Sequence, residues 1–203
     1  MTMIKGSDKR TASCPVDRLF IDRWSPRAMT GEEIRPADLD ILFEAARWAP
    51  SSHNNQPWRI LFARRNTVHW DAFFSLLADS NKVWGQHASV LLLFVSKSTF
   101  DHSGGPSVTH SFDAGAAWEN LALQGFLLGY VVHGMEGFDY ERARTSLGIP
   151  PDFSVEMMAA VGRPADAAIL PEGLRERETP TPRRPIEETV REGRFSFPVA
   201  ERR

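Results

Sequence analysis

Apolar residues recur along the chain at two spacings, one typical of surface helices and the other of buried strands. Between Pro36 and Pro50 they recur at i, i+3, i+4 and i+7 from Leu39, which predicts an amphipathic helix with one face on the core. Residues 89–96 (SVLLLFVS) are almost continuously apolar, which predicts a central strand with both faces covered. The chain therefore combines helices and strands around a core.

The same patterns predict further elements. Helices are expected at residues 15–23, 71–78, 113–130 and 139–147, and strands at 58–63, 131–133 and 155–161. The helix at 113–130 is apolar on most of its circumference, so we expect it to be central and buried. It contains Gly115, Gly125 and Gly129, each of which costs about 1 kcal/mol relative to alanine. Such glycines indicate that another backbone packs closely against this helix.

The two ends of the chain lack this periodicity. Residues 1–14 are expected to form a flexible N-terminal tail, and residues 15–203 a single domain. Within that domain, residues 164–203 are rich in proline and charge and are too polar to build a core of their own. This segment is expected to be an extended arm, either disordered or laid over another surface such as that of a partner subunit.

Composition and charge limit the functional classes. Of the 203 residues, 42% are hydrophobic and 25% are charged, which is typical of a globular protein and excludes a collagen-like repeat or a disulfide-stapled miniprotein. The net charge of −2 gives no broad reason to bind nucleic acid or an anionic membrane, so we expect neither partner. Most of the basic residues are arginine, whose planar guanidinium suits oxyanions.

Several common sites have no support in the sequence. Cys14 stands alone, so no disulfide framework, CxxC pair or cysteine zinc site is expected, and a reducing cytoplasmic location fits. His102 and His110 lack a metal-ligand spacing such as HExxH, and we expect no metal. The chain also lacks GxGxxG, GxxxxGK[ST] and GxSxG, the usual anchors of dinucleotide folds, P-loop enzymes and α/β-hydrolases.

Three separate segments instead offer groups suited to a flat polar ring with a phosphate tail. The first is 23–27 (RWSPR), where two arginines and a hydroxyl could bind phosphate, although alone it reads as a surface basic cluster. The second is 49–58 (APSSHNNQPW), a proline-bounded loop with donors and acceptors for the edge of a heteroaromatic ring. The third is 134–139 (GMEGFD), a turn whose glycines let backbone N–H groups approach a ligand.

These segments, together with Asn81 before the apolar strand and the long helix at 113–130, resemble the FMN-dependent nitroreductase family. Their order and spacing match from about residue 16 to residue 190. The resemblance implies an α+β nitroreductase-like fold, with a central mixed, mostly antiparallel sheet flanked by helices and an extended C-terminal arm. It also implies a homodimer with FMN at the subunit interface, the 113–130 helix packed at that interface, and the 164–203 arm embracing the partner.

The resemblance further implies which residues of this chain bind FMN. The phosphate end would be bound by Arg23 and Ser25, with Arg183 or Arg184. The pyrimidine edge would lie against Arg27 and Asn81. The remaining cofactor-binding residues would line the ring and the ribityl chain, with Glu136 and Gly137 presenting backbone N–H groups to N5 and O4; they are Pro50, Ser51, Ser52, Asn54, Gln56, Met135, Glu136 and Gly137.

The implied activity is a ping-pong cycle at flavin N5, in which NADH or NADPH gives hydride and a nitroaromatic, quinone or similar electron-poor acceptor takes it. No obligatory catalytic side chain is expected. The chain has Trp84 where some relatives place a lysine, and a short 98–109 loop, so its use of nicotinamides stays open. The alternatives are a specialised flavin enzyme, such as a reductive dehalogenase or a flavin-fragmenting enzyme, and a non-enzymatic flavin-binding protein.

Overall fold

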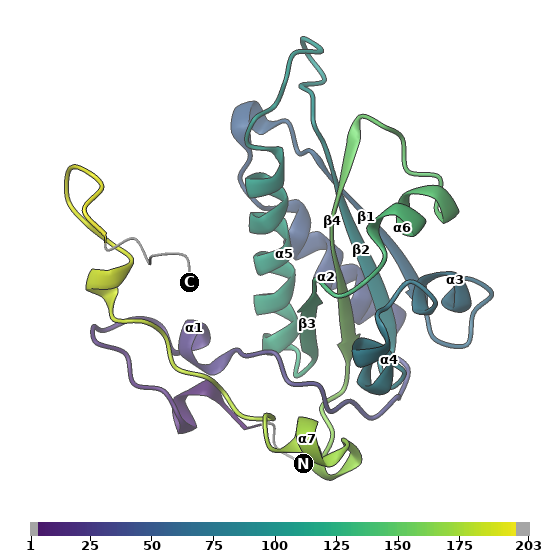
Figure 1. Ribbon diagram of the computed structural model, residues 1–203, viewed down its shortest axis with the longest axis vertical. Helices are drawn as coiled ribbons and strands as arrows, with labels where there is room; N and C mark the ends of the chain where they lie inside the picture. The colour runs from purple at the N-terminus through teal and green to yellow at the C-terminus, as the bar shows by residue number, and fades with distance from the viewer. Residues whose placement is uncertain (1–3, 198–203) are drawn as a thin grey trace, which may run out of the picture.

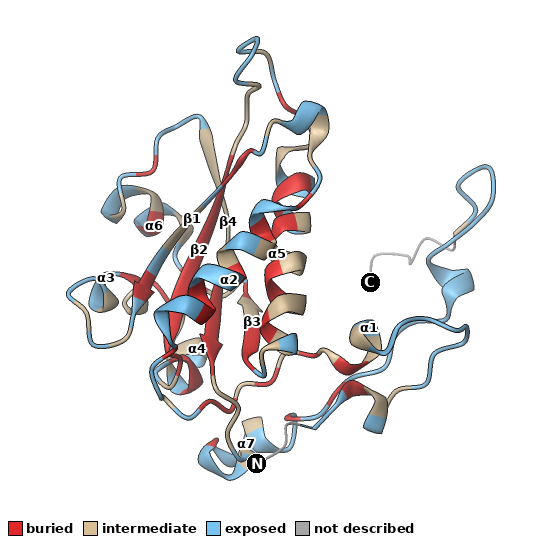
Figure 2. Ribbon diagram, turned by 180° about the vertical axis from the view of Figure 1, so that it is seen from behind, coloured by how far each residue is buried: buried red, intermediate tan, exposed pale blue. Residues whose placement is uncertain are grey.

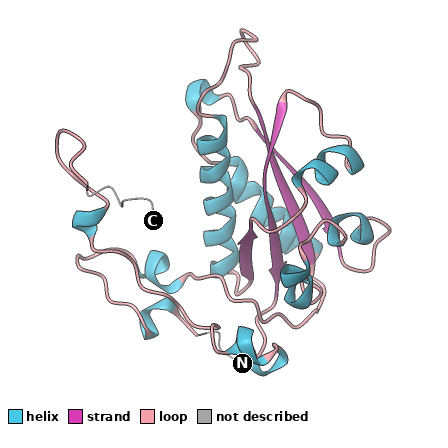
Figure 3. Cartoon of the chain, viewed as in Figure 1, coloured by secondary structure: helices cyan, strands magenta, loops and turns pink. Residues whose placement is uncertain are grey.

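The computed structural model describes residues 4–197 and is built on a four-stranded sheet (Figures 1 and 3). The strands are β1 (Trp58–Arg64), β2 (Val90–Lys97), β3 (Val131–Met135) and β4 (Phe153–Gly162), in the spatial order β1-β2-β4-β3. Each of these three pairings is antiparallel. The sheet is therefore antiparallel rather than mixed across the described residues.

Helices cover both faces of the sheet (Figure 2). Side chains of β2 alternate between two apolar layers: Leu92 and Phe94 pack with the helices α2 (Pro36–Arg47) and α5 (His110–Leu127), whereas Leu93 packs on the opposite face. That opposite layer includes α3 (Trp70–Phe74), α4 (Asp79–Gly85) and α6 (Tyr140–Ser146). Because both faces are covered, β2 is apolar along almost its whole length, as its sequence predicts.

The predicted strands and long helices are confirmed, with bounds that differ by a few residues. The 15–23 helix is shorter than predicted, because α1 comprises only Arg18–Asp22. Two short helices, α4 and α7 (Glu172–Arg175), are not in the prediction because neither contains enough turns to show an apolar period. Short 3-10 helices complete the described elements: η1 (Gly6–Asp8), η2 (Ser52–Asn54), η3 (Ala167–Ile169) and η4 (Ile186–Glu188).

The glycines of α5 do not mark one packing surface. A Cβ at Gly125 would lie 2.5 Å from Cγ2 of Val132, so this glycine lets α5 approach β3 of its own chain. A Cβ at Gly115 would meet no atom within 4 Å, and Gly129 follows the helix with a φ of +75°. Within residues 4–197, Gly125 alone of the three shows a close approach, to the Val132 side chain of β3, and the approach of a second copy to this helix stays a prediction.

The N-terminal segment and the first part of the arm pack on the body, whereas the last part of the described arm does not. The segment expected to be a flexible tail contains buried Gly6, and Nε1 of Trp24 donates a 2.6 Å hydrogen bond to the Ile4 carbonyl. In the expected arm, Leu170 is 2% exposed and belongs to the core, whereas residues 181–196 are exposed. Residues 1–3 of the expected tail and residues 198–203 of the expected arm lie outside the described residues.

Candidate functional site

A cavity of about 630 Å³ lies where the N-terminal region, β3 and the arm meet. Five arginines line it, a concentration of positive charge that suits a multiply charged anion. They are Arg10, Arg23, Arg27, Arg177 and Arg183. The other lining residues are Trp24, Ser25, His133, Gly134, Glu176, Thr179 and Thr181.

The loop after α1 supplies one wall of the cavity. Nη1 of Arg23 donates to Oγ of Ser25 at 3.3 Å, and its Nε lies 3.5 Å from a carboxylate oxygen of Glu119 on α5. The Arg23 side chain is 14% exposed, so these two contacts fix a mostly buried guanidinium. Helix α1 ends immediately before it, with the Arg23 N–H bonded to the Leu19 carbonyl. Arg23 and Ser25 are therefore held together at one edge of the cavity.

Arg27 is oriented by a carboxylate from the arm. Oε1 of Glu178 accepts hydrogen bonds from the backbone N–H groups of Arg27 and Ala28, and Oε2 lies 3.6 Å from Nη1 of Arg27. The Glu178 side chain is 4% exposed. The sequence does not reveal this contact, because Glu178 sits in an acidic and basic stretch that resembles a solvated surface. Its carboxylate partly compensates the charge of Arg27.

The floor of the cavity includes a histidine that the sequence does not single out. Nδ1 of His133 lies 2.9 Å from the Pro26 carbonyl oxygen, so it must donate its hydrogen to that acceptor. Burial, reinforced by the charges of Arg27 and Arg23, lowers the pKa of His133 to about 4, against the upward effect of the Pro26 hydrogen bond. The imidazole is therefore neutral at pH 7, and its hydrogen bond to Pro26 connects β3 to the loop that carries Arg23 and Arg27.

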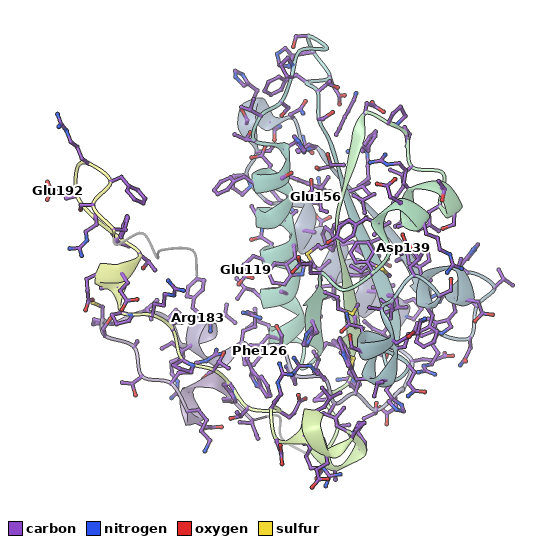
Figure 4. All side chains as sticks on the ribbon, viewed as in Figure 1. Glu119, Phe126, Asp139, Glu156, Arg183 and Glu192 are labelled. Atoms are coloured by element: carbon purple, nitrogen blue, oxygen red, sulfur yellow. The ribbon has the colours of Figure 1, made fainter. Side chains whose placement is uncertain are left out.

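Arg183 comes from the far end of the chain. It lies on the arm, on the side of α5 from which Glu119 projects (Figure 4). Among residues 4–197, its Nη1 donates hydrogen bonds only to the nearby carbonyls of Thr181 and Pro182, at 3.4 and 3.3 Å. Arg184 is exposed and does not line the cavity. Of the two arginines between which the sequence leaves a choice, Arg183 is the one placed here.

The proline-bounded loop lies elsewhere, at the N-terminal end of α5. Oδ2 of Asp113 accepts hydrogen bonds from the Ser52 N–H at 3.1 Å and from Oγ1 of Thr109 at 3.3 Å. The positive φ angles of His53, Asn54 and Gln56 are +50°, +52° and +48°, a left-handed conformation that residues other than glycine rarely adopt. Such strain within one short loop is typical of ligand-binding segments.

Asn81 supports a turn rather than pointing freely outward. Its Nδ2 donates to the Gly137 carbonyl at 2.9 Å, and its Oδ1 accepts from Nε1 of Trp84 at 3.2 Å. Trp84 is 1% exposed, and its ring packs against His133 with the ring centroids 4.5 Å apart. Within residues 4–197, the N–H groups of Glu136 and Gly137 donate no hydrogen bond to the protein.

The structure thus brings only part of the predicted site into one cavity. Four of the predicted residues line this cavity: Arg23, Ser25, Arg27 and Arg183. The predicted turn Met135–Gly137 does not line it but directly follows Gly134, which does. The Pro50–Gln56 loop contributes nothing to this cavity. Sequence reasoning misses Arg10, Arg177, Glu178 and His133. Among the described residues, no cluster of histidine, cysteine and acidic side chains could hold a metal ion, and no helix is long and apolar enough to cross a membrane.

Comparison with known proteins assigns the chain to a family. Residues 21–83 match the model of the nitroreductase family. The crystal structure of an FMN-containing oxidoreductase aligns over 93% of this chain and 97% of its own, with 46% identity and a TM-score of 0.90. The chain belongs to the nitroreductase family. The predicted α+β nitroreductase-like fold is thereby confirmed.

Two more relatives show how far the similarity extends. A Desulfovibrio desulfuricans protein described as a nitroreductase, solved in complex with FMN, is 26% identical with a TM-score of 0.70 and aligns over 91% of this chain and 100% of its own. An uncharacterised 15.4 kDa protein of Mycolicibacterium smegmatis is 33% identical over 88 residues. That match spans 43% of this chain and 59% of the curated relative.

Proposed function

We propose that this member of the nitroreductase family is an FMN-dependent oxidoreductase. It takes hydride from NADH or NADPH and reduces nitroaromatic, quinone or similar electron-poor acceptors in a ping-pong cycle. One observation carries the proposal: Arg23, Ser25 and Arg183 line the same cavity although they come from opposite ends of the chain. The family resemblance implies that Arg23, Ser25 and either Arg183 or Arg184 bind the FMN phosphate. The relatives that contain FMN support the same cofactor.

The residues present fit the phosphate end of FMN. A phosphate monoester carries nearly two negative charges, and the guanidinium groups of Arg23 and Arg183 can bind it through charge-assisted hydrogen bonds. Ser25 adds a hydroxyl donor beside Arg23. Gly134 of β3 also lines the cavity, and a Cβ there would lie 2.9 Å from Cε of Met157 and 3.2 Å from Cζ2 of Trp118, two side chains outside the cavity.

The turn after β3 supplies groups for the ring. FMN, when bound, supplies two-electron hydride chemistry at N5. The N–H groups of Glu136 and Gly137, which have no acceptor among residues 4–197, can donate to the ring edge, while Asn81 holds the Gly137 carbonyl in place. Arg27, oriented by Glu178, can place positive charge near the pyrimidine edge. No side chain of the chain is required as an acid or a base.

We propose further that the complete site needs a second copy of the chain. The Pro50–Gln56 loop lies at the N-terminal end of α5, outside the arginine cavity, so a partner's loop would have to complete the site. Two large apolar side chains of α5, Phe112 and Leu127, are 82% and 62% exposed. On the arm, Phe195 is 77% exposed. A homodimer with FMN at its interface would cover these surfaces.

Flavin loading and single-turnover reduction test the proposal. The purified protein is expected to be yellow or to take up FMN, and to sediment as a dimer that carries flavin absorbance. Anaerobic mixing with NADH or NADPH should bleach that absorbance, and a nitroaromatic or quinone should restore it. A protein that takes up no flavin would refute the proposal. Flavin binding without bleaching would instead favour a specialised flavin enzyme or a non-enzymatic flavin-binding protein.

A further inference from the structure

The N-terminal segment from Ile4 to Arg10 is fitted closely to the region that bears the cavity arginines. A Cβ at Gly6 would lie 1.8 Å from the Ile21 carbonyl oxygen, so only glycine allows this approach. The Ser7 N–H donates to Oδ1 of Asp22 at 3.2 Å. In Figure 1 this segment, the α1 region and the arm run side by side. The segment is therefore part of the framework that surrounds the cavity.

Arg10 joins three parts of this framework through one guanidinium group. Its Nη1 donates to the carbonyl oxygens of Ile21 and Arg23 at 3.2 and 3.1 Å, and its Nε donates to the carbonyl of Thr181 at 2.7 Å. Thr181 lies on the arm, two residues before Arg183. The Arg10 side chain thus holds the backbone of Arg23 and the arm backbone just before Arg183, the two arginines predicted to bind the phosphate.

Arg10 lies in a cavity where the positive charges outnumber the carboxylates that pair with them. Arg10, Arg23 and Arg183 line one cavity, and burial, followed by the charges of Arg183 and Arg23, lowers the pKa of Arg10. Within the part of the chain that the structure describes, neither Arg10 nor Arg183 pairs with a carboxylate, and Arg23 has only Glu119, at 3.5 Å. Like charges in one cavity repel, and an anion bound among them removes that repulsion.

We propose that Arg10 is a positioning residue that couples phosphate binding to the docking of the arm. The phosphate of the ligand neutralises the cluster formed by Arg10, Arg23 and Arg183, and the Arg10–Thr181 bond then holds the arm closed over it. The inference rests on the proposed function, because FMN is the ligand that brings the phosphate. It also predicts that the phosphate, rather than the flavin ring, controls the arm.

The test compares phosphate-bearing and phosphate-free ligands. Hydrogen exchange of arm amides at residues 178–184 is measured on the full protein alone, with FMN, with riboflavin and with inorganic phosphate. Dissociation constants for FMN and riboflavin are measured on the same samples. The variants are Arg10→Met, which keeps the chain length without a donor, and Arg10→Lys, which keeps the charge without the planar bridge. Lys9→Met is the matched control, because Lys9 is exposed and outside the cavity.

In the wild-type protein, FMN and inorganic phosphate should slow exchange in the arm, and riboflavin should not. Arg10→Met should weaken FMN binding by about 10-fold, change riboflavin binding by less than about 2-fold, and remove the protection by FMN. Arg10→Lys should recover part of the FMN affinity but not the protection of the arm. Lys9→Met should behave as the wild type.

The inference is overturned by protection of the arm by riboflavin equal to that by FMN, or by protection by FMN that survives in Arg10→Met. The wild-type comparison decides the first point even if the variants fail to fold. If the protein binds no flavin at all, the proposed function fails, but protection of the arm by inorganic phosphate still tests the role of the cluster. Absence of that protection would overturn the inference separately.

Discussion

Glu178 holds Arg27 from a position 151 residues later in the chain. One carboxylate oxygen accepts the backbone N–H groups of Arg27 and Ala28, and the other lies 3.6 Å from the Arg27 guanidinium. The arm is thus built into the site, because its first half fixes the loop that carries the arginines. This explains why a segment without a core of its own can still be ordered beside the sheet.

Removal of the Glu178 carboxylate should destabilise the protein. Glu178→Ala leaves two backbone donors without their acceptor in a buried environment, and each unsatisfied donor costs about 1–3 kcal/mol. We expect the free energy of unfolding to fall by at least about 2 kcal/mol, measured by chemical denaturation. Glu187→Ala, on the exposed part of the arm, is the matched control and should change it by less than about 0.5 kcal/mol. Equal effects of both substitutions would contradict the role of Glu178.

The buried His133 should make stability depend on pH. Its pKa falls from 6.5 when unfolded to about 4 when folded, so the unfolded chain binds more protons between these values. Its contribution is fully present above pH 6.5 and is lost as the pH falls toward 4. The difference corresponds to about 3 kcal/mol. His133→Asn keeps a donor for the Pro26 carbonyl but cannot titrate, so its unfolding free energy should fall less over this range. Parallel pH curves for both proteins would contradict the assignment.

The two glycines of α5 should respond in opposite directions. Gly125→Ala places a methyl group 2.5 Å from Cγ2 of Val132, and overpacking of this kind costs about 1–3 kcal/mol. Gly115→Ala meets open space and gains helix propensity of about 1 kcal/mol. Denaturation of both variants against the wild type measures the difference. A neutral Gly125→Ala would show that β3 and α5 can separate without loss.

The sequence predicts well those elements whose apolar residues repeat. Leu39 and Leu42 reveal the buried face of α2, and the continuous run of β2 reveals a strand covered on both sides. The α4 helix escapes prediction because only Trp84 and Gly85 within it are buried. Packing against the second layer, which no local pattern encodes, fixes that helix.

The candidate site likewise contains some residues that short motifs reveal and others that only the folded structure brings together. The family resemblance points to Arg23, Ser25 and one of Arg183 and Arg184, and the structure places Arg23, Ser25 and Arg183 around one cavity. Contacts between distant segments determine the rest: Arg10 lies in a stretch that reads as a loose tail, and Glu178 in one that reads as a solvated surface. Gly125 packs against Val132 of β3, and the spacing of residues within one helix cannot reveal which other element that helix contacts.

The contact between Asp113 and the Pro50–Gln56 loop predicts an effect on flavin that does not depend on the phosphate. Asp113→Ala removes the acceptor for the Ser52 N–H and frees a strained loop. If that loop lines the ring, FMN and riboflavin should both bind about 10-fold more weakly. Fluorescence titration with each flavin measures this, with the exposed Asp71→Ala as the control. A loss confined to FMN would place the loop near the phosphate instead.

The arginine pair on the arm offers the most direct test of the phosphate site. Arg183 lines the cavity and Arg184, its neighbour, does not, so the pair differs in position but not in chemistry. Binding of FMN and riboflavin is measured by calorimetry for the wild type, Arg183→Ala and Arg184→Ala. We expect the wild type to prefer FMN by at least about 10-fold, and Arg183→Ala to lose most of that preference while Arg184→Ala keeps it. Equal affinity of the wild type for both flavins, or binding of neither, would contradict the account.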